Sequence, residues 1–283
     1  MRLSTIQLNG RPTACVTVAE GLARIDQVLP GAPDDVMALL EGDRLGELAR
    51  AIAAGVDTSA LVDPGAAVLT PWTRPRKILG IGLNYRAHAG DLGEEAPRTS
   101  PASFLKADHT IVGPGEPIVV PGDLGTVTSE AELGLVVGRP CYRVSVDDAM
   151  SYVAGVVAVL DQTAEEVLLE NPRYLTRVKN YPTFFAFGPE LITLDEVLAE
   201  GPLEDLRVAT IHNGAVHRED VVGGMTFSPA ELLSFHSHVM PFFPGDILST
   251  GTPGAVAIQA GDTVRCELGD GLSFLENPVR TVG

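Results

Sequence analysis

The sequence has few cysteines and no cluster of basic residues. Its three cysteines, Cys15, Cys141 and Cys266, lack the C-x-x-C spacing that is typical of many structural zinc sites. This usage favours reduced thiols in a cytoplasm and argues against a structural zinc ion. The formal net charge is −17, from 37 acidic and 20 basic side chains. Because such a surface repels phosphate backbones and anionic lipid, we expect no nucleic-acid or membrane-surface partner.

Long apolar runs are also absent. The longest spans about nine residues, YVAGVVAVL at 152–160, and is too short to cross a bilayer. The first residues, MRLSTIQLNG, lack the apolar core of a signal peptide. With 45% hydrophobic and 20% charged residues, the composition is globular. We therefore expect a cytoplasmic protein of one or two domains with a large core.

The first quarter of the chain differs from the rest. Residues 1–62 mix short strands with one amphipathic helix, predicted over 33–54, whose first turn holds Asp34 and Asp35. Residues 63–77 contain three prolines and no periodicity, which is typical of a linker.

After Lys77 the chain consists of short apolar strands separated by Gly and Pro. Two short helices are expected to begin at Ser145 and at Ser228, where capping residues stand. We predict an α+β, β-rich protein, with a small N-terminal α/β domain over 1–70 and a β-rich domain over 71–283.

One predicted strand, VTSEAELGLVVG at 127–138, carries two glutamates one residue apart. Side chains alternate along a strand, so Glu130 and Glu132 share one face, roughly 7 Å apart at Cα. The other face is apolar and consists of Ala131, Leu133, Leu135 and Val137. If solvent covers the two carboxylates they cost little, but if they are enclosed they need a cation.

A third carboxylate follows the apolar run at 152–160. Asp161 alone could cap a helix predicted over 163–170. Together with Glu130 and Glu132 it would complete a set of three hard oxygen donors. Such a set, with water in the remaining positions, suits Mg²⁺ or Mn²⁺.

Two basic side chains are further candidates for chemistry. His88 and Asp91 are spaced to share one face of a short helix, where the carboxylate would orient the imidazole as a proton acceptor, although a surface pair is the alternative. Lys179 precedes a run of aromatic residues. Burial there would lower its pKa, unless the side chain extends to water.

The segment PGDILSTGTPGAV at 244–256 combines a turn, a strand and a glycine loop. Gly251 and Gly254 would let the backbone approach a ligand, and Thr252 offers a hydroxyl, although a simple tight turn fits as well. The pair His236 and His238 is no metal pair, because residues two apart on a helix do not face each other.

These motifs occur in one fixed order: GLNYRAH, P-x-x-x-P-x-x-F-x-K at 97–106, SEAELGLVVG, a strand ending in Asp161, Lys179 before FGP, HNG and TGTP. In this order they resemble the fumarylacetoacetate hydrolase family over about 72–283. The resemblance implies that family's mixed β-sheet roll, preceded by the small accessory domain of its longer members.

The resemblance also implies a site and a reaction. Glu130, Glu132 and Asp161 would bind Mg²⁺ or Mn²⁺, with Ca²⁺ as a further candidate. His88 and Asp91 would activate water, and Lys179 would stabilise an oxyanion or enolate. The implied substrate-binding residues are Tyr85, Phe104, Lys106, Gly251 and Thr252. The family cleaves a C–C bond of a small 1,3-dicarbonyl substrate through a metal-bound enolate, and its members are commonly homodimers.

The sequence departs from the family at four positions. Glu165 and Leu168 stand where an arginine and a glutamine are usual, Leu160 replaces an asparagine, and Pro182 replaces an aspartate. We interpret this as a changed, less charged substrate. Alternatives are a decarboxylase, isomerase or cyclase with the same enolate chemistry, or a binding protein that kept the metal for folding. The intact His88, Asp91 and Lys179 argue against the last.

Overall fold

Two β-sheets account for most of the protein, whose computed structural model describes residues 1–63, 65–86 and 99–282. Within these ranges the larger sheet has twelve strands and the smaller has five. The larger sheet follows the order β3 (Gly21–Arg24), β2 (Arg11–Val18), β1 (Arg2–Leu8), β11 (Phe185–Thr193), β10 (Val153–Ala164), β9 (Val127–Val137), β14 (Ile247–Ser249), β5 (Ile78–Gly82) and β6 (Ala102–Lys106). Three short strands lie off this path: β4 (Val68–Leu69), β7 (Ile111–Val112) and β15 (Ala255–Ile258).

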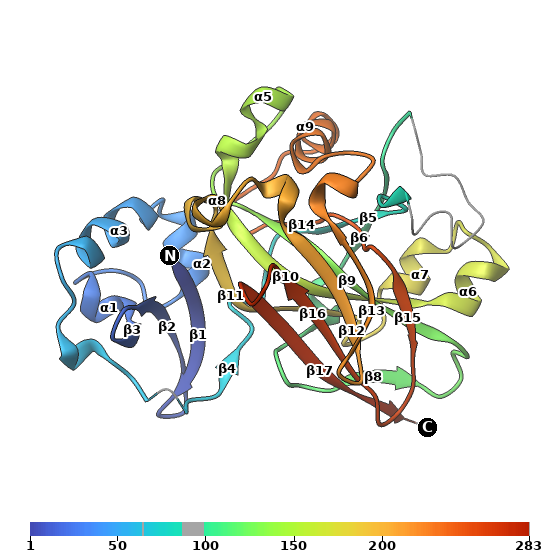
Figure 1. Cartoon of the computed structure of the whole chain (residues 1–283), viewed down its shortest axis with the longest axis horizontal. Helices are drawn as coiled ribbons and strands as arrows, with labels where there is room; N and C mark the ends of the chain where they lie inside the picture. Colours follow the sequence, from blue (N-terminus) through green and yellow to red (C-terminus); the bar gives the residue numbers. More distant parts are fainter. Residues whose placement is uncertain (64, 87–98, 283) are drawn as a thin grey trace.

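The smaller sheet lies across the middle of the larger one, with β16 and β17 over β9 and β10 (Figure 1). Its order is β13 (Ala215–Val221), β12 (Arg207–His212), β16 (Thr263–Leu268), β17 (Ser273–Val282) and β8 (Ile118–Pro121). Most pairings are antiparallel, and β14–β5, β11–β7 and β17–β8 are parallel. The prediction of an α+β, β-rich fold with mixed sheets is therefore confirmed.

Short helices surround the sheets, and no helix in the described ranges is long and apolar enough to cross a bilayer. They are α1 (Ile25–Val28), α2 (Val36–Glu41), α3 (Leu45–Ala53), α5 (Val146–Ala149), α6 (Glu165–Glu170), α7 (Leu175–Lys179), α8 (Leu194–Glu200) and α9 (Pro229–Val239).

The two faces of the larger sheet belong to two different hydrophobic cores. Leu133 and Leu135 of β9 pack with Val264 and Leu275 of the smaller sheet, and all four are fully buried. Val136, which points to the opposite face, belongs to the core that the N-terminal residues complete. The predicted alternation along β9 thus places its apolar residues 131, 133, 135 and 137 between the two sheets.

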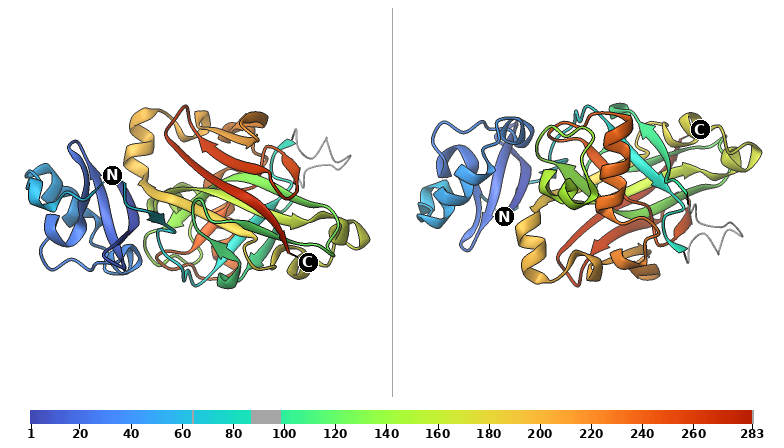
Figure 2. Two further views of the ribbon diagram at one scale, coloured as in Figure 1. Left: turned by 90° about the horizontal axis from the view of Figure 1, so that it is seen from below. Right: turned by 90° about the horizontal axis from the view of Figure 1, so that it is seen from above.

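The N-terminal strands continue the larger sheet. Strand β1 pairs antiparallel with β11, with Arg2 opposite Ile192, and β2 and β3 follow outward. Figure 2 shows this N-terminal segment at one end of the molecule from both directions. A division into domains between residues 70 and 71 stays a prediction.

The single helix predicted over 33–54 is wrong in one respect, because the structure has two helices there. α2 ends at Glu41 with Gly42 as its C-cap, and Asp43 adopts a left-handed backbone with φ of 52° before α3 begins. Leu40 and Leu48 are both buried, so the break keeps each apolar face on the core. Asp35 is the N-cap of α2, where its carboxylate accepts a hydrogen bond from the backbone N–H of Ala38 at 2.7 Å.

Residues 65–77, from the segment 63–77 predicted as a linker, pack against the sheet. Their strand β4 pairs with β1. Trp72 is buried, donates from its indole N–H to the carbonyl of Gly245 at 3.1 Å, and packs on Phe187 with the ring centroids 5.1 Å apart.

Both predicted helix starts are confirmed. Ser228 and Glu231 form a capping box at the start of α9, with Pro229 in its first turn. The hydroxyl of Ser145 accepts from the backbone N–H of Asp148 at the start of α5.

Candidate active site

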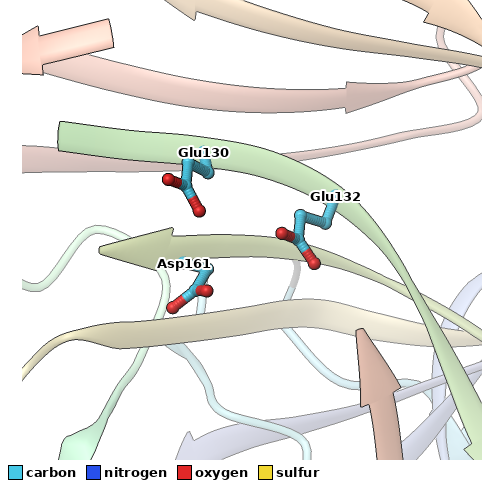
Figure 3. Close-up of side chains that lie close together, drawn as sticks. All are labelled: Glu130, Glu132 and Asp161. Atoms are coloured by element: carbon cyan, nitrogen blue, oxygen red, sulfur yellow. The ribbon is translucent and has the colours of Figure 1, made fainter. Parts of the chain in front are cut away.

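Strand pairing brings the three predicted carboxylates together. β9 and β10 are antiparallel, and their register places Asp161 directly opposite Glu130. Residues opposite each other in such a pair point to the same face, which Glu132 also shares. The ligand atoms of the three side chains lie within 4.8 Å of one another. Figure 3 shows the three carboxylates converging from the two strands.

The three carboxylates are largely shielded from solvent. Asp161 is 0% exposed, Glu132 is 1% exposed, and Glu130 is partly exposed. Asp161 lies inside β10, which runs on to Ala164, so it does not cap the following helix, which begins at Glu165. Buried carboxylates this close together require positive charge nearby.

Two buried lysines supply part of that charge. The ammonium group of Lys179, at the end of α7, lies 2.8 Å from Glu130 Oε2 and 2.6 Å from Asp161 Oδ2. The ammonium group of Lys106, at the end of β6, pairs with Asp161 Oδ1 and donates to the carbonyl of Gln162 at 3.3 Å. With all five groups ionised, three carboxylates and two ammonium groups leave one net negative charge.

The two lysines have opposite pKa shifts. Burial lowers the pKa of Lys106 to about 8. The ion pair with Asp161 acts in the opposite direction, but the nearby positive charge of Lys179 works against it. Burial also acts on Lys179, but the three carboxylates outweigh it and raise its pKa. The prediction that Lys179 has a lowered pKa or extends to water is therefore wrong, because the aromatic run lies beside a cluster of carboxylates.

Glu132 is held by a different set of groups. Its Oε2 accepts hydrogen bonds from the hydroxyl of Ser249 and, at 3.0 Å, from the backbone N–H of Gly251. Its Oε1 has no hydrogen-bond donor among the described residues. Burial, followed by the charges of Asp161 and Glu130, raises the pKa of Glu132. A divalent cation at Oε1 would counter that effect, and three carboxylates are hard donors that suit such an ion.

Among the predicted substrate-binding residues, Phe104 and Lys106 lie at the carboxylates. The ring of Phe104 covers the Lys179 ammonium group, 4.5 Å from ring centroid to Nζ. Gly80 makes room for this ring, since a Cβ there would lie 2.3 Å from it. Gly251 binds Glu132 through its N–H, as described above.

Tyr85 and Thr252 are placed differently. Tyr85 is fully buried in the core between the sheets, and its hydroxyl has no partner among the described residues. The hydroxyl of Thr252 is bonded within its own loop, to the carbonyl and N–H of Gly254. The predicted water-activating pair, His88 and Asp91, lies outside the described residues, and its role stays a prediction.

The departures from the family pattern lie next to the same cluster. Glu165 is the first residue of α6, and burial followed by the charge of Glu130 raises its pKa, while Lys179 acts against this. Leu168 packs partly buried against the main core. A fourth carboxylate therefore stands near the three that converge.

Ser249 and Thr163 are contacts of the site that the sequence did not reveal. Thr163 donates from its hydroxyl to Glu130 Oε1 at 3.0 Å. Thr163 lies two residues after Asp161 on the same face of β10. The alternation of side chains along a strand could therefore have predicted this contact from the sequence. Ser249 comes from β14, whose pairing with β9 no sequence pattern indicates.

Comparison with known proteins gives a consistent result. The profile of the fumarylacetoacetate hydrolase C-terminal domain matches residues 77–280. A mitochondrial oxaloacetate tautomerase of Rattus norvegicus is 29% identical over 262 residues, which cover 89% of this chain and 82% of the rat protein.

Two solved structures align over the full length of this chain and of their own. The 5-carboxymethyl-2-hydroxymuconate delta-isomerase of Mycobacterium smegmatis has a TM-score of 0.78 and 27% identity. The fumarylacetoacetate hydrolase of Exiguobacterium antarcticum has a TM-score of 0.84 and 25% identity. With a domain profile that spans well over half of its length, the chain belongs to the fumarylacetoacetate hydrolase family.

Proposed function

We propose that this chain is a divalent-metal-dependent hydrolase that cleaves a C–C bond in a 1,3-dicarbonyl substrate by way of an enolate. One observation carries the proposal: Glu130, Glu132 and Asp161 converge beside two buried lysines. A divalent ion would change the combined charge of these three carboxylates and two ammonium groups, all ionised, from −1 to +1, which complements a singly charged enolate. We propose Mg²⁺ or Mn²⁺, with Ca²⁺ as a further candidate.

The ion, when bound, would polarise the substrate's two oxygen atoms and stabilise negative charge on them. Lys179 uses two of its three N–H donors on Glu130 and Asp161, which leaves one for a substrate oxygen. Phe104 shields this ammonium group from water and thereby strengthens its attraction for the developing charge. Thr163 keeps the carboxylate of Glu130 in place.

Hydrolysis also requires an activated water molecule. We assign this role to His88, with Asp91 holding the imidazole ring. His88 would accept a proton as the water oxygen attacks the carbonyl carbon. The C–C bond then breaks, its electron pair leaves as the enolate, and a proton returned to the enolate carbon completes the second product.

A second candidate is enolate chemistry without hydrolysis, as in an isomerase or tautomerase, a decarboxylase or a cyclase. The names of the relatives favour an isomerase or tautomerase, because one relative is an oxaloacetate tautomerase and another is a delta-isomerase. These reactions use the carboxylates and Lys179 in the same way and need no attacking water.

The products distinguish these possibilities. Chelator-stripped protein, reloaded with Mg²⁺ or Mn²⁺, is incubated with acylpyruvates and with neutral β-diketones, and the products are identified by mass spectrometry. Hydrolysis gives two fragments that together contain one added water. A product of unchanged mass, or deuterium uptake from D₂O without cleavage, would favour isomerisation or tautomerisation, and loss of CO₂ would favour decarboxylation.

The metal's role is tested separately with Asp161→Ala. Asp161→Ala removes the ion-pair partner of Lys106 and one of the two partners of Lys179, so we expect it to be less stable than wild type, and circular dichroism must show that it is folded before metal binding is measured. We expect its Mg²⁺ affinity and its turnover to fall together. Full metal affinity and turnover in this variant would contradict the assigned ligands.

A further inference from the structure

The loop that follows β14 is bonded directly to one of the three carboxylates. Ser249, the last residue of β14, is 1% exposed and donates its hydroxyl to Glu132 Oε2. The backbone N–H of Gly251 donates to the same oxygen at 3.0 Å. Glu132 comes from β9, so these bonds join two segments that are 117 and 119 residues apart in the sequence.

Two donors on one oxygen determine which oxygen remains for a cation. Oε2 of Glu132 is occupied by Ser249 and Gly251, whereas Oε1 has no donor among the described residues. From this arrangement we propose that Ser249 is a positioning residue that turns Oε1 of Glu132 toward the divalent cation. The inference rests on the metal role in the proposed function.

The loop itself is rigidly placed, so it can hold the carboxylate in one orientation. Gly251 has a φ of +98°, and a Cβ there would lie 2.9 Å from the Cβ of Asn84. The amide of Asn84 donates to the carbonyls of Thr250 and Phe227, at 2.8 and 3.1 Å, and accepts from the N–H of Phe227 at 3.0 Å. Outer partners of this kind orient ligating carboxylates, and their loss weakens metal binding.

The adjacent residue provides a matched control. Thr250 is also buried and also donates a hydroxyl bond, but to the backbone carbonyl of Leu133 at 2.8 Å and not to a carboxylate. Ser249→Ala and Thr250→Val therefore each remove one buried hydroxyl from neighbouring positions. Only Ser249→Ala removes a contact to Glu132.

The test measures Mn²⁺ binding to the full chain by electron paramagnetic resonance of free Mn²⁺, with thermal unfolding measured in parallel. We expect Ser249→Ala to raise the Mn²⁺ dissociation constant roughly 10- to 100-fold. Thr250→Val should leave the dissociation constant within about twofold of wild type, even if its melting temperature falls. Ser249→Thr, which keeps the hydroxyl, should recover most of the affinity.

Three outcomes would overturn the inference. If wild type binds Mn²⁺ and Ser249→Ala binds it equally well, Ser249 does not position the ligand, and the proposed function stands. If Ser249→Ala and Thr250→Val weaken binding equally, the effect is a general loss of packing. If wild type binds no Mn²⁺, the metal role in the proposed function fails as well.

Discussion

Lys179 should stabilise the fold as well as contribute to the proposed chemistry. Its side chain is 6% exposed and pairs with Glu130, 13% exposed, and with Asp161, 1% exposed. Lys179→Met retains most of the side chain's volume and apolar contact but removes the ammonium group. The variant leaves three converging carboxylates with Lys106 as the one ammonium group that contacts them among the described residues.

The size of the effect follows from this burial. Removing one partner of a buried ion pair typically costs about 3–5 kcal/mol, because the remaining charge stays buried without compensation. We expect the free energy of unfolding of Lys179→Met to fall by about that amount in chelator. A divalent ion that binds the folded state adds about 2.7 kcal/mol at a hundred times its dissociation constant. Mg²⁺ should therefore recover much of the loss in the variant.

Urea denaturation measures this difference, followed by both far-UV circular dichroism and the fluorescence of Trp72, the single tryptophan. Coincident curves from the two probes justify a two-state free energy. Arg177→Met is the matched control on the same helix. Arg177 lies 3.8 Å from Glu170 with both side chains more than half exposed, and such pairs contribute at most about 1 kcal/mol. A loss below about 1 kcal/mol for Lys179→Met would refute the reasoning.

Three further predictions concern the reaction, the substrate and the sheet. His88→Ala should lower kcat by about 10²–10⁴ with unchanged Mn²⁺ affinity, and an unchanged kcat would remove His88 from the mechanism. Glu165→Gln should raise kcat/KM for oxaloacetate relative to a neutral β-diketone by about tenfold, the effect of one partly screened repulsion. The control Glu166→Gln should leave this ratio of kcat/KM values unchanged. Equal ratios in the two variants would contradict the interpretation that Glu165 repels an anionic substrate. Gly155→Ala should cost about 1–3 kcal/mol in urea denaturation, because its Cβ would lie 2.0 Å from the Ile192 carbonyl oxygen, and a neutral effect would show that the strand can shift.

The convergence of the carboxylates was largely predictable from the sequence. Alternation along 127–138 fixes that Glu130 and Glu132 share a face, and the apolar run before Asp161 predicts a neighbouring buried strand. What the sequence could not supply is the register that places Asp161 opposite Glu130. The family resemblance supplied it instead, since the resemblance carries a ligand set.

Other features depended on contacts between distant segments. The helix over 33–54 breaks at Asp43, although its apolar periodicity continues across the break. Residues 65–77 of the predicted linker are held by Trp72 and by β4, whose partners come from elsewhere in the chain. The raised pKa of Lys179 follows from carboxylates on two other strands, which no local pattern around the lysine contains.

The pairing of β1 with β11 affects the order in which the chain can fold. Arg2 emerges during synthesis before its partner Ile192, which follows 190 residues later. The end of β11 at 190–192 therefore stays an open strand edge until the N-terminal strands return to it, and open edges invite pairing between molecules. Contacts this distant in sequence also slow folding. A shortened chain that begins at residue 71 would expose this edge permanently, so aggregation is the failure expected of it even where every residue of the site is retained.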